Sequence, residues 1–84
     1  MNLKFIDDYI NNKILIDENY IRITYYDIRI KNNLSEDEIT QFLGLVKIKL
    51  NNMGYKVYFT EEKYRYKNAN MKVQLNELLI AIKE

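Results

Sequence analysis

The sequence predicts one α+β domain, in which three helices pack on a small antiparallel sheet. Its length of 84 residues leaves room for one domain (1–84) and one core. Apolar residues recur at helical spacing in 2–14 and again in 36–53, whereas they alternate with polar residues in 55–59, as in a strand. Hydrophobic residues make up 48% and charged residues 30% of the chain, a balance typical of globular proteins rather than disordered ones.

The first predicted helix covers 2–14, where apolar residues follow one another at three- and four-residue steps: Leu3, Ile6, Tyr9 or Ile10, and Ile14. The sequence "IDEN" that follows is typical of a turn. Segment 20–33 allows two interpretations. Its isoleucines and tyrosines favour a single long strand over 20–30, which would fit a ferredoxin-like domain. Alternatively, a short strand over 20–23 precedes a helix over 25–33 that Thr24 caps. We adopt the divided interpretation, because the alternation breaks at "YY".

The third predicted helix has the clearest start and end in the sequence. Ser35 is placed as its N-cap, and Glu38 three residues later completes a capping box. The acidic residues in this first turn favour the positive end of the helix dipole. Gly54 is expected to end the helix. Its core-facing residues are predicted at helical spacing: Ile39, Phe42, Leu43, Val46, Leu50 and Met53.

The rest of the chain is predicted to form a hairpin. Alternation over 55–59 indicates a strand, and this strand needs a partner. The last segment, "VQLNELLIAIK", has both strand and helix character, and we assign it as the second strand. The polar stretch between them, which includes 63–72, is expected to be a long loop.

This order of elements resembles the winged helix-turn-helix family over nearly the whole chain. The residues that carry the resemblance are Thr24 at the head of the second helix, Leu34 in the turn, Ser35 capping the third helix, and Gly54 with Tyr55 where the wing begins. The resemblance implies DNA binding as the commonest role, with protein contacts as a second one. Abundant Asn, Lys, Ile and Tyr are typical of AT-rich coding DNA, so we expect an origin in a phage or mobile element.

The predicted wing, 63–72, holds the main candidates for nucleic-acid contacts. Alternation places Lys63, Arg65 and Lys67 on one face, and Lys72 adds a fourth cation. Such a wing tip can contact phosphates or a minor groove. The alternative is a hairpin with a solvated charged face. Because the net charge is only +1, any attraction to duplex DNA must come from such a local patch.

The outward face of the third helix holds two further pairs of candidates. Thr40 and Gln41 can hydrogen-bond to base edges, although the acidic first turn would repel phosphate. Gly44 and the outward Ile48 form a smooth, partly apolar strip suited to a partner helix or backbone, and a mid-helix glycine costs roughly 1 kcal/mol relative to alanine. The alternative is a solvated outer face with a tolerated glycine and one exposed isoleucine.

Other function classes are disfavoured by the residues that the chain lacks. Without His or Cys, there is no disulfide, no thiolate or imidazole metal site, and no usual general base, so we expect no enzyme, metal or cofactor. The two glycines do not form a phosphate-binding motif. No apolar run approaches the roughly 20 residues of a membrane span, so we expect no membrane partner and a cytoplasmic protein.

Two hypotheses for function follow from these patterns. The first is a regulator or accessory factor that binds duplex DNA through the basic wing. The second is a protein-binding module without DNA binding, such as a phage-encoded inhibitor of a host enzyme, or a homodimer, that uses Gly44 and Ile48.

Overall fold

The computed structural model describes residues 2–59 and 77–84. In chain order its elements are α1 (Leu3–Ile16), β1 (Tyr20–Thr24), the π-helix η1 (Tyr26–Lys31), α2 (Glu36–Asn52), β2 (Tyr55–Phe59) and β3 (Glu77–Lys83). The predicted α+β class and the predicted order of helices and strands are confirmed. The predicted contact residues Lys63, Arg65, Lys67 and Lys72 lie outside the described residues.

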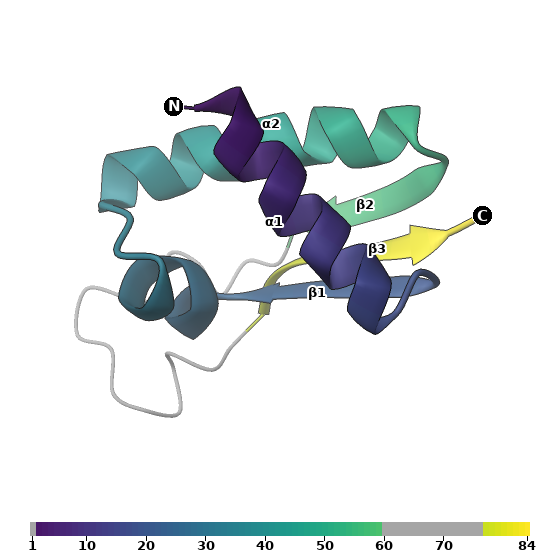
Figure 1. Cartoon of the computed structure of the whole chain (residues 1–84), viewed down its shortest axis with the longest axis horizontal. Helices are drawn as coiled ribbons and strands as arrows, with labels where there is room; N and C mark the ends of the chain where they lie inside the picture. The colour runs from purple at the N-terminus through teal and green to yellow at the C-terminus, as the bar shows by residue number, and fades with distance from the viewer. Residues whose placement is uncertain (1, 60–76) are drawn as a thin grey trace.

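The three strands form an antiparallel sheet in the order β1-β3-β2, so that β3 lies between the other two (Figure 1). Alternation along β1 shows which face of the sheet is covered. Ile21 and Ile23 of β1 are buried, whereas Tyr20 and Arg22 between them are exposed. The buried face packs against the helices, and α1 crosses α2 and β1 in Figure 1.

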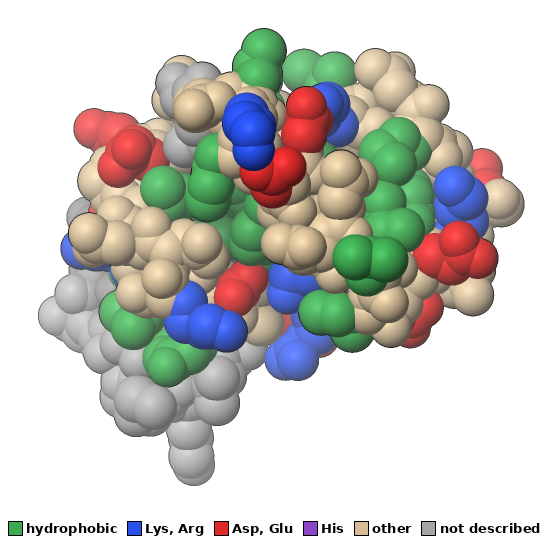
Figure 2. Space-filling view, in the orientation of Figure 1, with side chains coloured by type: hydrophobic (Ala, Val, Ile, Leu, Met, Phe, Trp, Pro, Cys, Tyr) green, Lys and Arg blue, Asp and Glu red, His purple; other side chains and the backbone are tan. Residues whose placement is uncertain are grey.

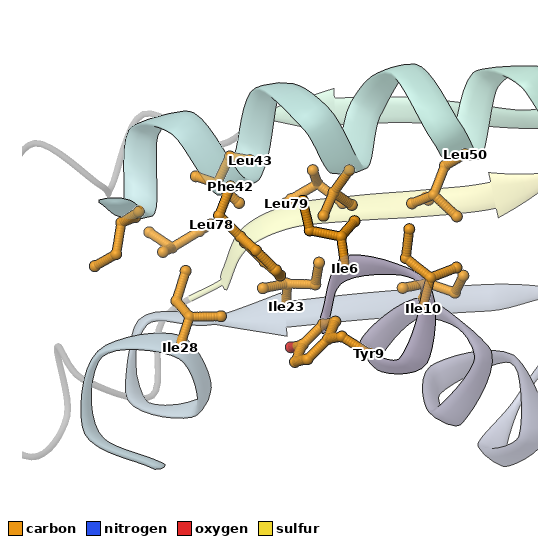
Figure 3. Close-up of a cluster of buried hydrophobic side chains, with 14 of the residues drawn as sticks. Ile6, Tyr9, Ile10, Ile23, Ile28, Phe42, Leu43, Leu50, Leu78 and Leu79 are labelled. Carbon is orange, nitrogen blue, oxygen red and sulfur yellow. The ribbon is translucent and has the colours of Figure 1, made fainter. Parts of the chain in front are cut away.

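The core fills the space between the two α-helices and this buried sheet face (Figure 3). Phe42 of α2 is fully buried, and its ring meets that of Tyr9 edge-on at 5.1 Å between centroids. Other fully buried side chains come from α1, β1, η1, α2 and β3: Ile6, Ile21, Ile23, Ile28, Val46, Leu50, Leu78 and Leu79. One continuous core therefore joins segments that are far apart in the sequence.

Two residues predicted to face the core are exposed. Leu3 is 63% exposed because it lies in the first turn of α1, beyond the edge of the packed region, and Met53 is 40% exposed because it caps α2 past its last buried turn. The other core-facing predictions for α2 are confirmed, since all five side chains from Ile39 to Leu50 on that face are buried.

The segment after β1 is helical, so the single-strand interpretation of 20–30 is wrong. The Asp27 N–H donates to Thr24 Oγ1 at 3.2 Å, which is the capping contact that the sequence predicts. The turn is wider than predicted, because η1 is a π-helix in which Asn32 N–H donates to the Asp27 carbonyl. The Asn32 side chain donates to the same oxygen at 2.7 Å. This wide turn places Ile28 in the core.

Both predicted ends of α2 are confirmed. Ser35 Oγ accepts from the Glu38 N–H at 3.2 Å, and a Glu38 carboxylate oxygen accepts from the Ser35 N–H at 3.0 Å. Gly54 has φ of +91°, a conformation that residues with a side chain rarely adopt. The chain can therefore reverse sharply from α2 into β2, which runs back along the helix (Figure 1).

None of the helices in 2–59 combines the length and the apolar character that crossing a membrane would require.

Candidate functional site

The outward side of α2, which we call the outer face of α2, is formed by six residues at helical spacing: Asp37, Thr40, Gln41, Gly44, Ile48 and Asn51. All six are exposed, as the sequence predicts for Thr40, Gln41, Gly44 and Ile48, whereas the opposite side of the same helix is buried. The structure thus brings the predicted base-contact pair, Thr40 and Gln41, onto one surface with the predicted partner-contact pair, Gly44 and Ile48.

Gly44 lies at the centre of this face, and nothing inside the described fold requires a glycine there. Apart from the helix's own backbone and the adjacent residues, no described atom lies within 4 Å of the position that a Cβ would occupy. Ile48, one turn further along, is 59% exposed. The outer face therefore has a shallow notch beside an apolar projection, and packing within the described residues explains neither.

The first turn of α2 gives the outer face an acidic end. Its residues are Glu36, Asp37 and Glu38. Hydrogen bonds from the backbone and side chain of Ser35 lower the pKa of Glu38, so this carboxylate stays charged. Glu36 accepts a hydrogen bond from the Tyr25 hydroxyl at 2.6 Å and lies 3.8 Å from Arg29. Burial and then this hydrogen bond raise the pKa of Tyr25.

The two polar candidates on this face differ in their freedom to contact a ligand. The Thr40 hydroxyl donates to the Glu36 carbonyl within the helix at 3.4 Å. Gln41 is exposed, and its amide group can both donate and accept hydrogen bonds. Gln41 is therefore the better placed of the two to contact a ligand.

Three lysines lie around β2, with Lys56 on one face of the strand and the other two beside rings on the opposite face, and we call them the β2 lysine group: Lys47, Lys56 and Lys83. Each ammonium group lies over an aromatic ring of β2: Lys47 over Phe59 at 5.5 Å, Lys56 over Tyr58 at 5.7 Å, and Lys83 over Tyr55 at 4.6 Å. No carboxylate in 2–59 or 77–84 lies within salt-bridge distance of them.

The other six cations of the described residues each have a carboxylate partner. Lys4 pairs with Asp8 at 2.9 Å, and Lys49 pairs with Asp7. Basic and acidic side chains consequently lie next to one another on the face that carries α1 (Figure 2). These pairs leave little uncompensated positive charge on that side.

The charge of the chain is divided unevenly along the sequence. Residues 2–59 and 77–84 hold nine Lys and Arg against ten Asp and Glu, a net charge of −1. Residues 60–76 hold four Lys and Arg against two Glu, a net charge of +2. In the sequence this basic segment follows directly after Phe59, the last residue of β2, whose ring Lys47 contacts.

The sequence did not predict a groove of about 450 Å³ beside β1, which is an edge strand of the described sheet. At its side, Asp27 accepts a hydrogen bond from the Tyr9 hydroxyl and lies 3.5 Å from Lys13 and 3.9 Å from Lys31. Burial raises the pKa of Tyr9, and the hydrogen bond to Asp27 adds to this effect. The cluster ties α1 to η1, so its polar groups have structural partners.

The β2 lysine group was also missed by the sequence interpretation. Alternation in "YKVYF" places Lys56 and Tyr58 on one face, and that signal was available. The contacts of Lys47 and Lys83 depend instead on how α2 and β3 lie against β2, which local pattern does not give.

Within the parts of the chain that the structure describes, no three acidic residues come together in a way that could hold a metal ion.

Comparison with known proteins adds no assignment. No protein-family model matches the chain, and no curated protein or solved structure gives a significant match.

Proposed function

We propose that this chain is a winged-helix domain that binds duplex DNA, and that its β2 side makes the main contacts. The order of helices and strands supports the winged-helix assignment, because a helix and a short strand precede the capped helix pair and two strands follow it. In the sheet, β3 lies between β1 and β2, so β2 and β3 are neighbours, as a wing requires.

The observation that carries the proposal is the position of the uncompensated positive charge. The β2 lysine group has no carboxylate partner among the described residues, and the basic segment 60–76 continues from the same strand. Phosphate contacts from Lys and Arg supply most of the non-specific affinity for DNA. The exposed rings of Tyr58 and Phe59 beside Lys56 and Lys47 add apolar surface that sugar and base groups can contact.

In this proposal the outer face of α2 is not the main contact with DNA. Glu36, Asp37 and Glu38 place three negative charges at the end of the helix that would approach the phosphate backbone. We therefore assign Lys63, Arg65, Lys67 and Lys72 the leading role and the β2 lysine group a supporting one. Gln41 and Thr40 remain secondary candidates for base contacts.

The test is the fluorescence anisotropy of a labelled mixed-sequence duplex, titrated with the full chain at several salt concentrations. Changing Lys63, Arg65, Lys67 and Lys72 together to Ala should abolish binding. Changing Lys47 and Lys56 to Ala should weaken it and reduce the slope of log K against log salt by roughly 0.9 for each phosphate that the variant no longer neutralises. Absence of salt-sensitive binding by the wild type at low ionic strength would refute the proposal.

A matched control tests whether the position of the two lysines matters, or only the number of positive charges removed. Changing Lys4 and Lys31 to Ala also removes two positive charges, but from lysines that are paired with Asp8 and Asp27. We expect this control to bind with nearly wild-type affinity. An equal loss in both double variants would mean that the β2 side has no special role.

A second candidate function is binding to another protein through the outer face of α2. The open space at Gly44 and the exposure of Ile48 favour it, because neither is explained within the described fold. It predicts that Ile48→Asp removes protein association in light scattering while leaving the fold and any salt-sensitive DNA binding unchanged.

A further inference from the structure

The outer face of α2 has the shape and charge to pair with a copy of itself. Its centre holds a notch at Gly44 and an apolar projection at Ile48, one helical turn apart. A residue without a side chain lets a second helix approach closely, since the distance between packed helices depends on the side chains at the contact. A complementary partner must therefore offer a projection opposite Gly44 and a space opposite Ile48.

A second α2 in antiparallel orientation offers both. When a two-fold axis passes between these positions, Ile48 of each copy faces Gly44 of the other. The same register places Gln41 opposite Asn51 of the second copy and Thr40 opposite Asn52 of the second copy. All of these side chains are exposed. Their amide and hydroxyl groups can form hydrogen bonds around an apolar centre, as at the rim of a protein interface.

The charges at the two ends of α2 distinguish this orientation from the parallel one. The first turn carries three carboxylates, whereas the other end carries one charge of each sign: Lys83 Nζ donates to the Met53 carbonyl oxygen at 2.8 Å, and the Glu84 N–H donates to the Gly54 carbonyl oxygen at 3.1 Å. Antiparallel pairing keeps the two acidic first turns apart, brings each of them towards the end that holds Lys83, and aligns the two helix dipoles in opposite directions. Parallel pairing would bring together two acidic first turns, which repel one another.

We propose that the outer face of α2 is a homodimer interface, in which two antiparallel helices interlock through Ile48 and Gly44. This inference deepens the second candidate function by naming the partner, and it does not depend on DNA binding. Two crossing helices bury less than a standard interface, so the dimer is weak and reversible.

The experiment is sedimentation velocity of the full chain without DNA, from micromolar to millimolar concentration. The wild type should show reversible association. Ile48→Gly removes the projection, and Gly44→Ile fills the notch, so each single change should weaken association about tenfold or more. The double variant, Gly44→Ile with Ile48→Gly, exchanges projection and notch, and it should regain most of the association.

The recovery in the double variant is specific to this register, because only there do positions 44 and 48 face one another. Far-UV circular dichroism and thermal melting check that each variant is folded, and Ile48→Ala replaces Ile48→Gly if the glycine unfolds the helix. Wild-type protein that stays monomeric over the whole range overturns the proposal. Association that both single changes leave intact, or that the exchange does not restore, overturns it as well. None of these results changes the outcome of the DNA titration, so the dimer proposal and the DNA-binding proposal can each be refuted without the other.

Discussion

The two faces of α2 have the same backbone but different relations to the rest of the molecule. The inner face contributes five buried side chains, and Phe42 among them contacts rings on α1. The outer face contributes exposed residues, with a glycine in open space at its centre. The inner face is explained by the fold, and the outer face is not.

This difference shows where function should be sought in a small domain. A residue that the core requires is constrained whatever the protein does. Gly44 lowers the stability of α2 relative to alanine, and no contact among the described residues requires a glycine there. It also lies beside Ile48, which is exposed. Three substitutions and a change of pH test this contrast.

The largest effect is expected at the centre of the inner face. Phe42→Ala leaves a cavity between α1, α2 and the sheet, and it should lower the free energy of unfolding by about 3–5 kcal/mol. Because domains of this size are only marginally stable, the variant should be largely unfolded. Chemical denaturation followed by circular dichroism measures this. A loss below about 1 kcal/mol would show that the inner face is not the core.

The next test uses alkaline pH, because Tyr9 packs edge-on against Phe42. Its pKa is raised in the folded state by burial and by Asp27, so the unfolded chain releases this proton first. The stability that it contributes is complete below the ordinary tyrosine pKa of about 10 and is lost as pH rises above it. Urea denaturation near neutral and at alkaline pH should show a smaller loss in Tyr9→Phe than in the wild type. Tyr25 and Tyr55, whose pKa values are also raised, account for part of the loss that remains.

The outer face should behave in the opposite way at Gly44. Gly44→Ala places a methyl group in open space and removes the helix cost of glycine, so it should stabilise the fold by about 1 kcal/mol. Thermal melting at low protein concentration measures this without contributions from association. Destabilisation would mean that the fold requires a glycine at position 44, and this would contradict the contrast between the two faces.

The smallest effect on stability is expected at Ile48. Ile48→Ser shortens an exposed side chain, so the free energy of unfolding should change by less than about 0.5 kcal/mol. Its effect should appear in association instead. Equal losses of stability at Ile48 and at a buried position such as Val46 would contradict the assignment of Ile48 to a binding surface.

Local signals gave the features that the sequence predicted well. The strand 55–59, the capping box at Ser35 and Glu38, and the left-handed Gly54 each depend on a few neighbouring residues. The π-helical form of η1 and the exposure of Leu3 depend on how distant elements pack, and the sequence pattern did not give them.

Of the candidate surfaces too, one follows from local sequence pattern, and the others depend on the tertiary arrangement. Helical periodicity was enough to place Thr40, Gln41, Gly44 and Ile48 on one exposed face. The β2 lysine group and the Asp27 cluster required the tertiary arrangement, because their members come from different elements. Contacts between elements are the part of a site that one sequence predicts least.

The most direct test of the contrast between the two faces of α2, in which the outer face is a binding surface for a second copy of the chain, is a dilution series of ¹⁵N-labelled protein followed by two-dimensional NMR. The account predicts concentration-dependent shifts of the backbone amide signals centred on Gly44 and Ile48. Signals of β1 and η1 should stay constant. Shifts confined to β1 and η1, or no shift at Gly44 and Ile48 up to millimolar concentration, would contradict the claim.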